Sequence, residues 1–371
     1  MAKVRYWSRL QNQIERGKKG LNTGIPFYGF TSLSKHIMNI QQGRYDLIAA
    51  GTSVGKTAFV NSTYAFGAIE FLQQNPNYVH NLEIIYYCLE IPPEDMMAKH
   101  IASLIWKDHG ILTTINEIKS LGDNELRPEV EALIESYEEK LEEIQNKYIH
   151  FKTSLSPKSL FRDLITYAEK RGEVIRDKNN NILEFKPKDE SLITLIVVDH
   201  IGLLNYKDYA NKKEAIDITS RHLVFFRNMC GFSPVVVSQI NRGSEQMDRQ
   251  NGENWMPKLA DIKDSGNTQE DANTIIALAS PFYYGVSACL GYDITKYKDR
   301  YRLGSILKNR DGQRGLLASF LFIGEYGGYY QLPSNGEGAG KPEQLKKIDE
   351  YYAKNRKDGK SKSTSDKRKL Y

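Results

Sequence analysis

One stretch in the first fifth of the chain, residues 44–62, constrains the fold more than any other. An apolar run from Tyr45 to Ala50 predicts a buried strand, a short turn of small residues follows, and a helix is expected from Lys56 onward. The turn closes with Gly55-Lys56-Thr57, the end of the P-loop pattern. In that pattern successive backbone N–H groups wrap the phosphates of a nucleotide, and the N-terminus of the helix adds positive dipole. We therefore predict a nucleotide site.

The side chains of this loop have predicted roles in that site. Lys56 is expected to reach the β- and γ-phosphates of the nucleotide, and the Thr57 hydroxyl is expected to hold Mg²⁺. The pattern normally opens with glycine, but Ala50 stands there and Gly51 follows one step later, which leaves a chance glycine turn as the alternative. Because strand, turn and helix fall in the required order, we favour the nucleotide site. Its predicted residues are Ala50, Gly51, Thr52, Ser53, Val54, Gly55, Lys56, Thr57 and Ala58.

The composition is that of an ordinary soluble globular protein. Of 371 residues, 40% are hydrophobic and 26% are charged. No apolar run approaches the roughly 20 residues that span a membrane, and the N-terminus lacks the apolar stretch of a signal peptide. The three cysteines are far apart, lie in apolar settings and show no zinc-site spacing. These features predict a cytoplasmic protein that does not enter a membrane.

The net charge of +5 is concentrated at the C-terminal end. Residues 354–371 contain eight basic and two acidic residues, so this segment carries +6 and everything before it sums to −1. The body of the protein is therefore not basic, and any nucleic-acid surface in it must be a local patch. We expect residues 333–371 to be a disordered basic tail, with non-specific nucleic-acid contact as the alternative.

Continuously apolar segments alternate with helical patterns along the rest of the chain. The clearest, Ser191–Asp199, predicts a strand that is buried on both faces, as in parallel sheets. The βαβ rhythm predicts an α/β fold with a mostly parallel, doubly wound and twisted sheet flanked by helices. Further strands are expected at 83–89, 149–153, 234–238, 274–279, 303–308 and 316–323, and helices at 56–74, 92–106, 129–148, 157–170 and 214–229.

The chain is expected to consist of three parts. The first has helical character, with Trp7, Leu10 and Ile14 at helical spacing, and either docks on a neighbouring subunit or is a surface helix. A polar surface hairpin at about 173–190 is expected to be inserted in the second part. The predicted boundaries are 1–19 for the N-terminal helix, 20–332 for the α/β domain and 333–371 for the tail.

Three polar side chains follow predicted strands and should meet the loop at one edge of the sheet. They are Glu90, Asp199 and Gln239, and in open α/β sheets ligands bind beyond the carboxyl ends of the strands. Nucleotide hydrolysis needs Mg²⁺ held by a hydroxyl and a carboxylate, a group that orients water and a group that senses the γ-phosphate. Thr57 and Asp199 suit the metal, Glu90 the water and Gln239 the γ-phosphate. Each also has a simpler explanation, since a strand-terminal aspartate often caps the next turn.

Seven short motifs follow one another in a fixed order along the chain. They are Gly20-Leu-Asn-Thr-Gly24, Ala49-Ala-Gly-Thr-Ser-Val-Gly-Lys-Thr57, Cys88-Leu-Glu-Ile-Pro92, Ile196-Val-Val-Asp199, Val237-Ser-Gln-Ile-Asn-Arg242, Asp261-Ile-Lys-Asp-Ser-Gly266 and Lys308-Asn-Arg-Asp-Gly312. With these motifs the sequence resembles the hexameric replicative DNA helicases of the DnaB type, which have a RecA-like ATPase core. The resemblance covers about Gly20 to Leu332, and an alanine that opens the P-loop is normal in that family.

The resemblance implies a role for each matching residue. Glu90 would activate water, Asp199 would complete the Mg²⁺ site, and Gln239 would link the γ-phosphate to a DNA-facing loop. Lys308 and Arg310 would reach into the neighbouring subunit's site, Arg310 as arginine finger; the alternative for Arg310 is a surface arginine in a turn. The residues expected to contact single-stranded DNA are Arg242, Lys263, Asp264 and Gly266.

Three departures from the family pattern are visible, two at single residues and one at the N-terminal end. His200 stands where tyrosine is frequent, and Asp264 replaces a more usual glutamate. Only about twenty residues precede the core, so we expect a compact phage or mobile-element member that lacks the N-terminal primase-binding domain. Its localisation would then be the bacterial host cytoplasm. Coupling to primase is left open by this departure, and a loader is a further candidate partner.

The predicted function is an ATP-dependent motor that assembles as a homo-oligomeric, hexameric ring, translocates on single-stranded DNA and unwinds duplex during replication. A 5′-to-3′ polarity is implied by the resemblance only. Two alternatives stay open at this point. One is a RecA-like recombination ATPase that catalyses strand exchange as a filament. The other is a RecA-fold ATPase that acts as assembly factor or loader on a protein partner.

Overall fold

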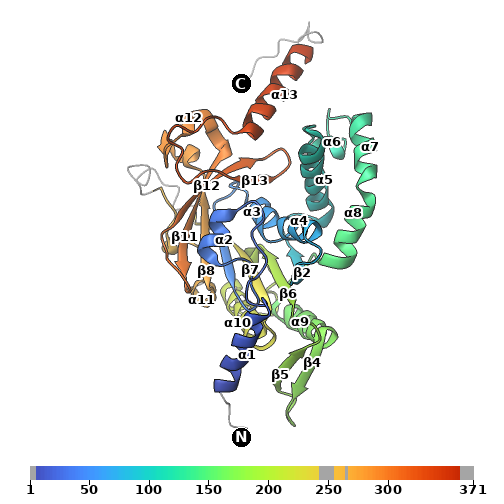
Figure 1. Ribbon diagram of the computed structural model, residues 1–371, viewed down its shortest axis with the longest axis vertical. Coiled ribbons are helices and arrows are strands. Elements are labelled where there is room, and N and C mark those ends of the chain that lie inside the picture. Colours follow the sequence, from blue (N-terminus) through green and yellow to red (C-terminus); the bar gives the residue numbers. More distant parts are fainter. Residues whose placement is uncertain (1–5, 242–254, 264–265, 360–371) are drawn as a thin grey trace.

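A nine-stranded sheet forms the centre of the molecule in a computed structural model that describes residues 6–241, 255–263 and 266–359. Its strand order is β13-β12-β11-β8-β1-β7-β6-β2-β3 (Figure 1). The strands from β8 to β3 are parallel, and β11, β12 and β13 extend the sheet in antiparallel fashion. The predicted α/β fold is confirmed. The strands are β1 (Asp46–Ala50), β2 (Asn81–Cys88), β3 (Ile149–Lys152), β6 (Leu192–Asp199), β7 (Ser233–Gln239), β8 (Thr274–Ala279), β11 (Tyr301–Asn309), β12 (Leu317–Ile323) and β13 (Gly328–Gln331).

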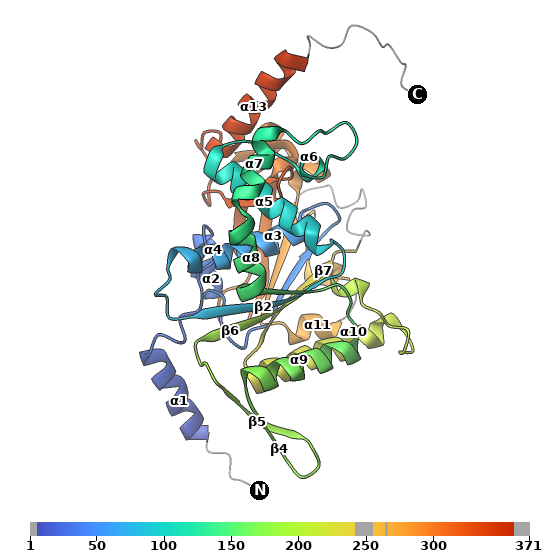
Figure 2. The ribbon, with the colours of Figure 1, turned by 90° about the vertical axis from the view of Figure 1, so that its right-hand side faces the viewer.

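Helices cover both faces of the sheet. Figure 2 shows α3, α4 and α5 on one side and α9, α10 and α11 on the other, with α7 and α8 outside α5. Their bounds are α1 (Tyr6–Lys18), α2 (Thr31–Ile37), α3 (Lys56–Thr63), α4 (Phe66–Gln74), α5 (Pro93–His109), α6 (Ile115–Ile118), α7 (Pro128–Ser136), α8 (Glu138–Glu143), α9 (Pro157–Arg171), α10 (Lys212–Cys230), α11 (Gly266–Asp271), α12 (Ile294–Tyr297) and α13 (Glu343–Gly359).

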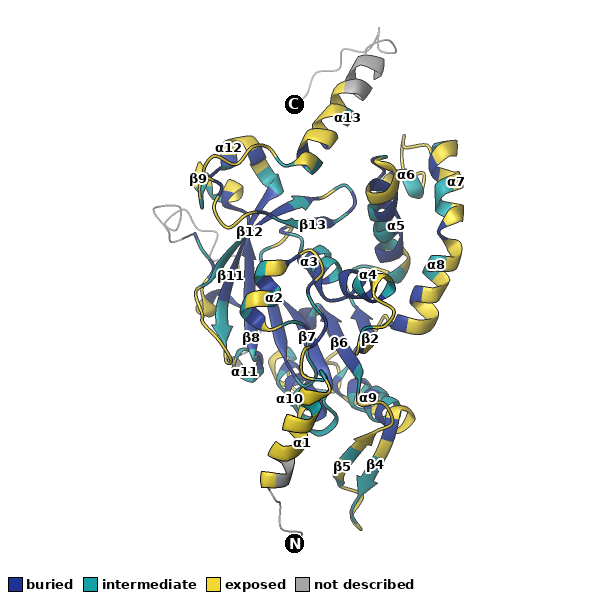
Figure 3. Cartoon of the chain, in the orientation of Figure 1, coloured by how far each residue is buried: buried dark blue, intermediate teal, exposed yellow. Residues whose placement is uncertain are grey.

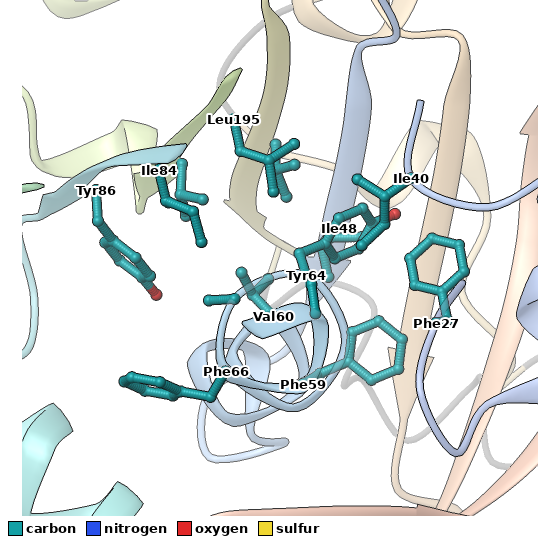
Figure 4. Close-up of a cluster of buried hydrophobic side chains, with 14 of the residues drawn as sticks. Phe27, Ile40, Ile48, Phe59, Val60, Tyr64, Phe66, Ile84, Tyr86 and Leu195 are labelled. Carbon is teal, nitrogen blue, oxygen red and sulfur yellow. The ribbon is translucent and has the colours of Figure 1, made fainter. Parts of the chain in front are cut away.

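The two helical layers give the sheet two hydrophobic cores, which explains why its strands are continuously apolar. In β1, Ile48 packs in the cluster that contains Phe59 of α3, whereas Leu47 packs in the cluster that contains Phe226 of α10. Successive side chains of a strand point to opposite faces, so both sets are buried. Figure 4 shows the first cluster, and Figure 3 shows the central strands as the most continuously buried part of the chain.

The register of the parallel strands brings the predicted site residues to one edge. Ala50 pairs with Gln239 across β1 and β7, and Cys88 pairs with Asp199 across β2 and β6. The chain therefore leaves β1, β2, β6 and β7 at the same carboxyl edge. The loop after Ala50 and the residue Glu90 lie just beyond it.

Two predicted helices are interrupted. The expected helix 56–74 is wrong as one unit, because α3 ends at Thr63 and α4 begins at Phe66. At this turn a Cβ on Gly67 would lie 2.1 Å from the Ser62 carbonyl oxygen, so the close approach of the two helices requires glycine. The expected helix 129–148 breaks at Tyr137, whose hydroxyl donates a hydrogen bond to Asp108 at 2.6 Å, and it ends in a π turn before β3.

The prediction that the whole segment 333–371 is disordered is wrong. Residues Glu343–Gly359 form α13, and Leu345 and Ile348, three positions apart, are buried in a cluster that includes Tyr292 and Leu332. The many charged residues of this segment favoured a prediction of disorder. Its narrow apolar stripe is nevertheless sufficient to pack a helix against the core. Residues 360–371, which belong to the predicted tail, lie outside the described residues.

Several further elements complete the fold. The strands β4 (Gly172–Arg176) and β5 (Ile182–Pro187) pair as an antiparallel hairpin within the predicted 173–190 insertion. This hairpin and α1 project from the same end of the molecule, opposite α13 (Figure 1). Between β8 and β11 the chain forms the short strands β9 (Ala288–Cys289) and β10 (Tyr292–Asp293), which the sequence did not predict. In the described residues, no helix is both long and apolar enough to cross a bilayer.

Candidate functional site

The loop between β1 and α3 is built on a glycine with left-handed backbone. Gly55 has φ +96°, and a Cβ there would lie 3.0 Å from the Phe322 ring and 3.1 Å from the Tyr329 hydroxyl. Backbone conformation and space therefore both require glycine at the position that closes the P-loop pattern. The α3 helix begins at the next residue, so the loop ends at the N-terminus of a helix, as an anion site needs.

Lys56 folds back over this loop. Its side chain is 8% exposed, and its ammonium donates a hydrogen bond to the Gly51 carbonyl oxygen at 3.1 Å. Burial lowers the pKa of Lys56, and the negative charges of Glu90 and Asp199 oppose that shift. The ammonium is thus desolvated beside two carboxylates, where the phosphate oxygens of a nucleotide would interact with it strongly.

Asp199 is a deeply buried carboxylate at this edge. It ends β6 and is 2% exposed. Burial raises its pKa to about 6, the Glu90 charge adds to the rise, and the Thr57 hydroxyl and Lys56 oppose it. Within the described part of the chain, its Oδ1 is buried and has no hydrogen-bond partner. An orphaned carboxylate oxygen beside the Thr57 hydroxyl is a donor set that suits a hard cation such as Mg²⁺.

Glu90 lies at the mouth of the site and is accessible to solvent. The amide of Leu89 donates to the Asp199 carbonyl oxygen at 2.7 Å, which fixes the end of β2 against the end of β6. The Glu90 carboxylate is half exposed, and its Oε2 lies 3.9 Å from Nε2 of His200. His200, which departs from the family pattern, is therefore a direct neighbour of the predicted catalytic glutamate.

Gln239 connects the loop to the segment that carries the predicted DNA contacts. Its Nε2 donates to the Thr52 hydroxyl at 2.9 Å, and its backbone carbonyl accepts from the Lys263 amide at 2.8 Å. The Ser238 hydroxyl donates to the Lys263 carbonyl at 3.0 Å. Lys263 is exposed and Gly266 begins α11. The predicted DNA residues Arg242 and Asp264 lie outside the described residues.

Lys308 and Arg310 do not join the site of their own chain. The Lys308 ammonium donates to the carbonyls of Gln269 and Glu270 at 2.7 and 2.9 Å, and the Arg310 guanidinium also donates to the Glu270 carbonyl. These carbonyls belong to the C-terminal end of α11, where cations are favoured. Because β11 runs antiparallel to β8, both cations lie at the amino edge of the parallel strands, opposite the loop.

Two residues that touch the loop were missed by sequence reasoning. The Arg302 guanidinium and the Tyr329 hydroxyl both donate hydrogen bonds to the Val54 carbonyl oxygen. The strand predicted at 303–308 begins at Tyr301, so Arg302 is part of the sheet. The sequence does show an arginine next to an apolar strand. The neighbouring residues, however, do not indicate which segment this arginine contacts.

The fold and this loop together define a RecA-like P-loop ATPase domain. The structure superposes on a solved ATPase domain with a TM-score of 0.64 and 21% sequence identity, covering 89% of this chain and 100% of that one. A DnaB-like replicative helicase, described with its interactions with primase, matches with a TM-score of 0.63 and 22% identity, covering 89% of this chain and 68% of that one. The chain belongs to the DnaB-like helicase C-terminal domain family, whose model matches residues 24–330.

Curated relatives agree with this membership. The replicative DNA helicase DnaC of Bacillus subtilis (strain 168) is 25% identical over 327 residues, which are 88% of this chain and 60% of that protein. The replicative DNA helicase DnaB of Buchnera aphidicola subsp. Acyrthosiphon pisum is 25% identical over 261 residues, 70% of this chain and 47% of that protein. The chain thus spans about half to three fifths of the length of these relatives.

Proposed function

We propose that this chain is the motor of an ATP-dependent DNA helicase that works in DNA replication. The observation that carries the proposal is that Lys56, Thr57, Asp199, Glu90 and Gln239 lie at one edge of the sheet, beside a loop with a left-handed Gly55 that ends at the N-terminus of α3. Membership of the helicase family supplies the reaction class, ATP hydrolysis coupled to movement on DNA.

Mg²⁺ would be held by Thr57 and Asp199. This ion is usually bound by one or two protein oxygens together with phosphate oxygens and water, so one hydroxyl and one carboxylate are a sufficient protein share of its ligands. The orphaned Oδ1 of Asp199 supplies the carboxylate oxygen. When bound, the ion would neutralise charge on the transferring phosphoryl group.

The other residues at this edge would bind the phosphates, activate the attacking water and sense the γ-phosphate. Lys56 would contact the phosphate oxygens, and Glu90, which is exposed at the mouth, would orient and deprotonate the attacking water. Gln239 would sense the γ-phosphate. Its contact with Thr52 and its backbone link to Lys263 give a short path from nucleotide to the predicted DNA-facing segment, where Lys263 and Gly266 would track the phosphates of single-stranded DNA.

Arg310 would act on the site of a neighbouring subunit. Arg302, near the start of β11, touches the loop of its own chain, whereas Arg310 follows the end of the same strand. Eight residues at about 3.3 Å each separate the two by roughly 25 Å, which is farther than an arginine side chain reaches. The geometry therefore supports a finger supplied in trans, and hydrolysis would require an oligomer such as the proposed hexameric ring.

Helix α1 offers a contact for that oligomer. Trp7, Leu10 and Ile14 lie on one stripe of the helix and are 66%, 46% and 47% exposed. Arg16 fixes the other end of the helix to the core through hydrogen bonds to Gln42 and to the Glu190 carbonyl. We propose that the apolar stripe packs on a neighbouring subunit. Primase and a helicase loader are further proposed partners, by analogy with the family.

The test is a set of three measurements on the purified chain. We expect ATP hydrolysis that single-stranded DNA stimulates, unwinding of a forked duplex with a 5′ arm, and closed rings in electron micrographs with ATP and DNA. A loader would show no DNA stimulation, and a strand-exchange protein would form filaments and pair strands without directional unwinding. Hydrolysis that ignores DNA would contradict the helicase proposal.

A further inference from the structure

Arginine 302 is buried inside the antiparallel extension of the sheet, next to the phosphate-binding loop. Its side chain is 0% exposed. The guanidinium donates to Asp299 Oδ1 at 2.9 Å and to Ser280 Oγ at 3.3 Å, and it lies 4.8 Å from the centre of the Phe322 ring. A charge buried this deeply is stable only when such partners surround it.

The same guanidinium also holds the loop. Its Nε donates to the carbonyl oxygen of Val54 at 2.9 Å. The Tyr329 hydroxyl, from β13, donates to the same oxygen at 2.7 Å. One backbone carbonyl in the middle of the loop therefore accepts two hydrogen bonds from strands that lie 248 and 275 residues away in sequence.

Because the peptide bond is planar, the hydrogen bonds to the Val54 carbonyl also fix the orientation of the next backbone N–H in the loop. In a trans peptide the C=O and the following N–H point in opposite directions, so a fixed Val54 carbonyl fixes the direction of the Gly55 N–H. The carbonyl points toward Arg302 of β11 and Tyr329 of β13, so the Gly55 N–H points away from these two side chains. The Phe322 ring and Tyr329 hydroxyl that exclude a Cβ at Gly55 hold the same peptide from one side.

We propose that Arg302 and Tyr329 are positioning residues that preorganise the β-phosphate cradle of the loop by holding the Val54 carbonyl. The inference rests on the proposed nucleotide hydrolysis and adds two residues that no P-loop motif contains. Because a β-phosphate is present in ADP and ATP alike, loss of this clamp weakens both ligands equally. It raises KM for ATP and leaves kcat unchanged, as expected for binding that is equal in ground and transition states.

The experiment compares Tyr329→Phe with a matched control, Tyr301→Phe. Each change removes one buried hydroxyl and keeps the ring; Tyr301 lies beside Arg302 on β11, and its hydroxyl pairs with Ser319 Oγ at 2.8 Å, away from the loop. The dissociation constants of a fluorescent ADP analogue with Mg²⁺ and the steady-state constants for ATP are measured for both variants. One hydrogen bond predicts an increase of about two- to tenfold in Kd and KM for Tyr329→Phe, and no change for Tyr301→Phe.

Arg302→Lys is the stronger perturbation. Lysine keeps a cation near Asp299 but cannot form the planar fork that also reaches Val54, so the increase should be about tenfold to hundredfold. If this variant does not fold, the two tyrosine variants decide alone. Equal Kd values for Tyr329→Phe and Tyr301→Phe would overturn the inference, and so would a fall in kcat at unchanged Kd. Failure of the proposed function is seen separately, in a wild-type chain that neither binds nor hydrolyses ATP.

Discussion

Replacing Asp199 by asparagine is expected to stabilise the nucleotide-free protein at neutral pH while removing its Mg²⁺-dependent affinity for nucleotide. The substitution keeps the size of the side chain and deletes a charge that is buried at the end of β6 with an unpaired Oδ1 among the described residues. A buried carboxylate that binds a cation lowers the free energy of unfolding while the site is empty. Its burial is compensated only when the cation is bound.

The magnitude follows from the pKa of Asp199, which burial raises from 3.8 to about 6. Between these values the unfolded chain has lost the proton and the folded chain still holds it, so the free energy of unfolding falls as the pH rises. At 1.36 kcal/mol for each pKa unit, the raised pKa lowers the free energy of unfolding by about 1 kcal/mol at pH 4.5 and by about 3 kcal/mol at pH 7.5, compared with a carboxyl whose pKa stays at 3.8. Asparagine does not titrate and avoids this loss.

Urea unfolding of wild type and Asp199→Asn across this pH range measures the effect, with Asp208→Asn as control. Asp208 is exposed in the loop before α10, so its substitution removes the same charge without changing burial. We expect the stability advantage of Asp199→Asn to grow by about 2 kcal/mol between pH 4.5 and pH 7.5, and to be reversed by Mg²⁺ and ADP, which bind the wild type only. An advantage that is constant with pH, or a variant less stable at pH 7.5 than wild type, would show that burial does not raise the pKa of Asp199.

Four further variants have expected outcomes. Lys56→Ala should abolish ATP turnover because the phosphates lose their main cationic contact, whereas Glu90→Gln should bind ATP normally and hydrolyse it very slowly; normal turnover by Glu90→Gln would contradict its assigned role. Gly67→Ala should lower the free energy of unfolding by about 1–3 kcal/mol, because its Cβ meets the Ser62 carbonyl, and an unchanged urea midpoint would contradict this packing. Deleting residues 360–371, which carry a net charge of +4, should weaken single-stranded DNA binding and flatten its salt dependence while basal ATPase is kept; loss of ATPase would show a structural role for this segment.

The parts of the site that are local in sequence could be predicted. The loop from Ala50 to Thr57 is one strand, one turn and one helix start, so its residue types alone indicated its shape. The placement of Asp199 and Gln239 at the same edge of the sheet could also be predicted, because parallel strands end at one edge whatever their exact register. Their roles in hydrolysis stay predictions.

The parts that depend on distant contacts could not be predicted. Nothing near Arg302 indicates that it reaches Val54, since the contact requires the antiparallel strands to fold back beside β8. The break before Phe66 depends on the approach of Gly67 to Ser62, which a helical pattern does not show. The short apolar stripe of α13 is buried only because it packs on the cluster around Tyr292, which is distant in sequence.

A mixture of two inactive variants tests the central claim, that the active site is shared between subunits of a DNA-dependent motor. Arg310→Ala and Glu90→Gln should each hydrolyse ATP very slowly, since a finger in trans is worth about 10³–10⁵ in turnover in other P-loop enzymes. Under conditions of subunit exchange, some interfaces combine the intact Glu90 of one variant with the intact Arg310 of the other. Mixing should therefore restore DNA-stimulated ATPase in proportion to these interfaces. Near-normal turnover by Arg310→Ala alone, or no recovery in mixtures shown to exchange subunits, would contradict it.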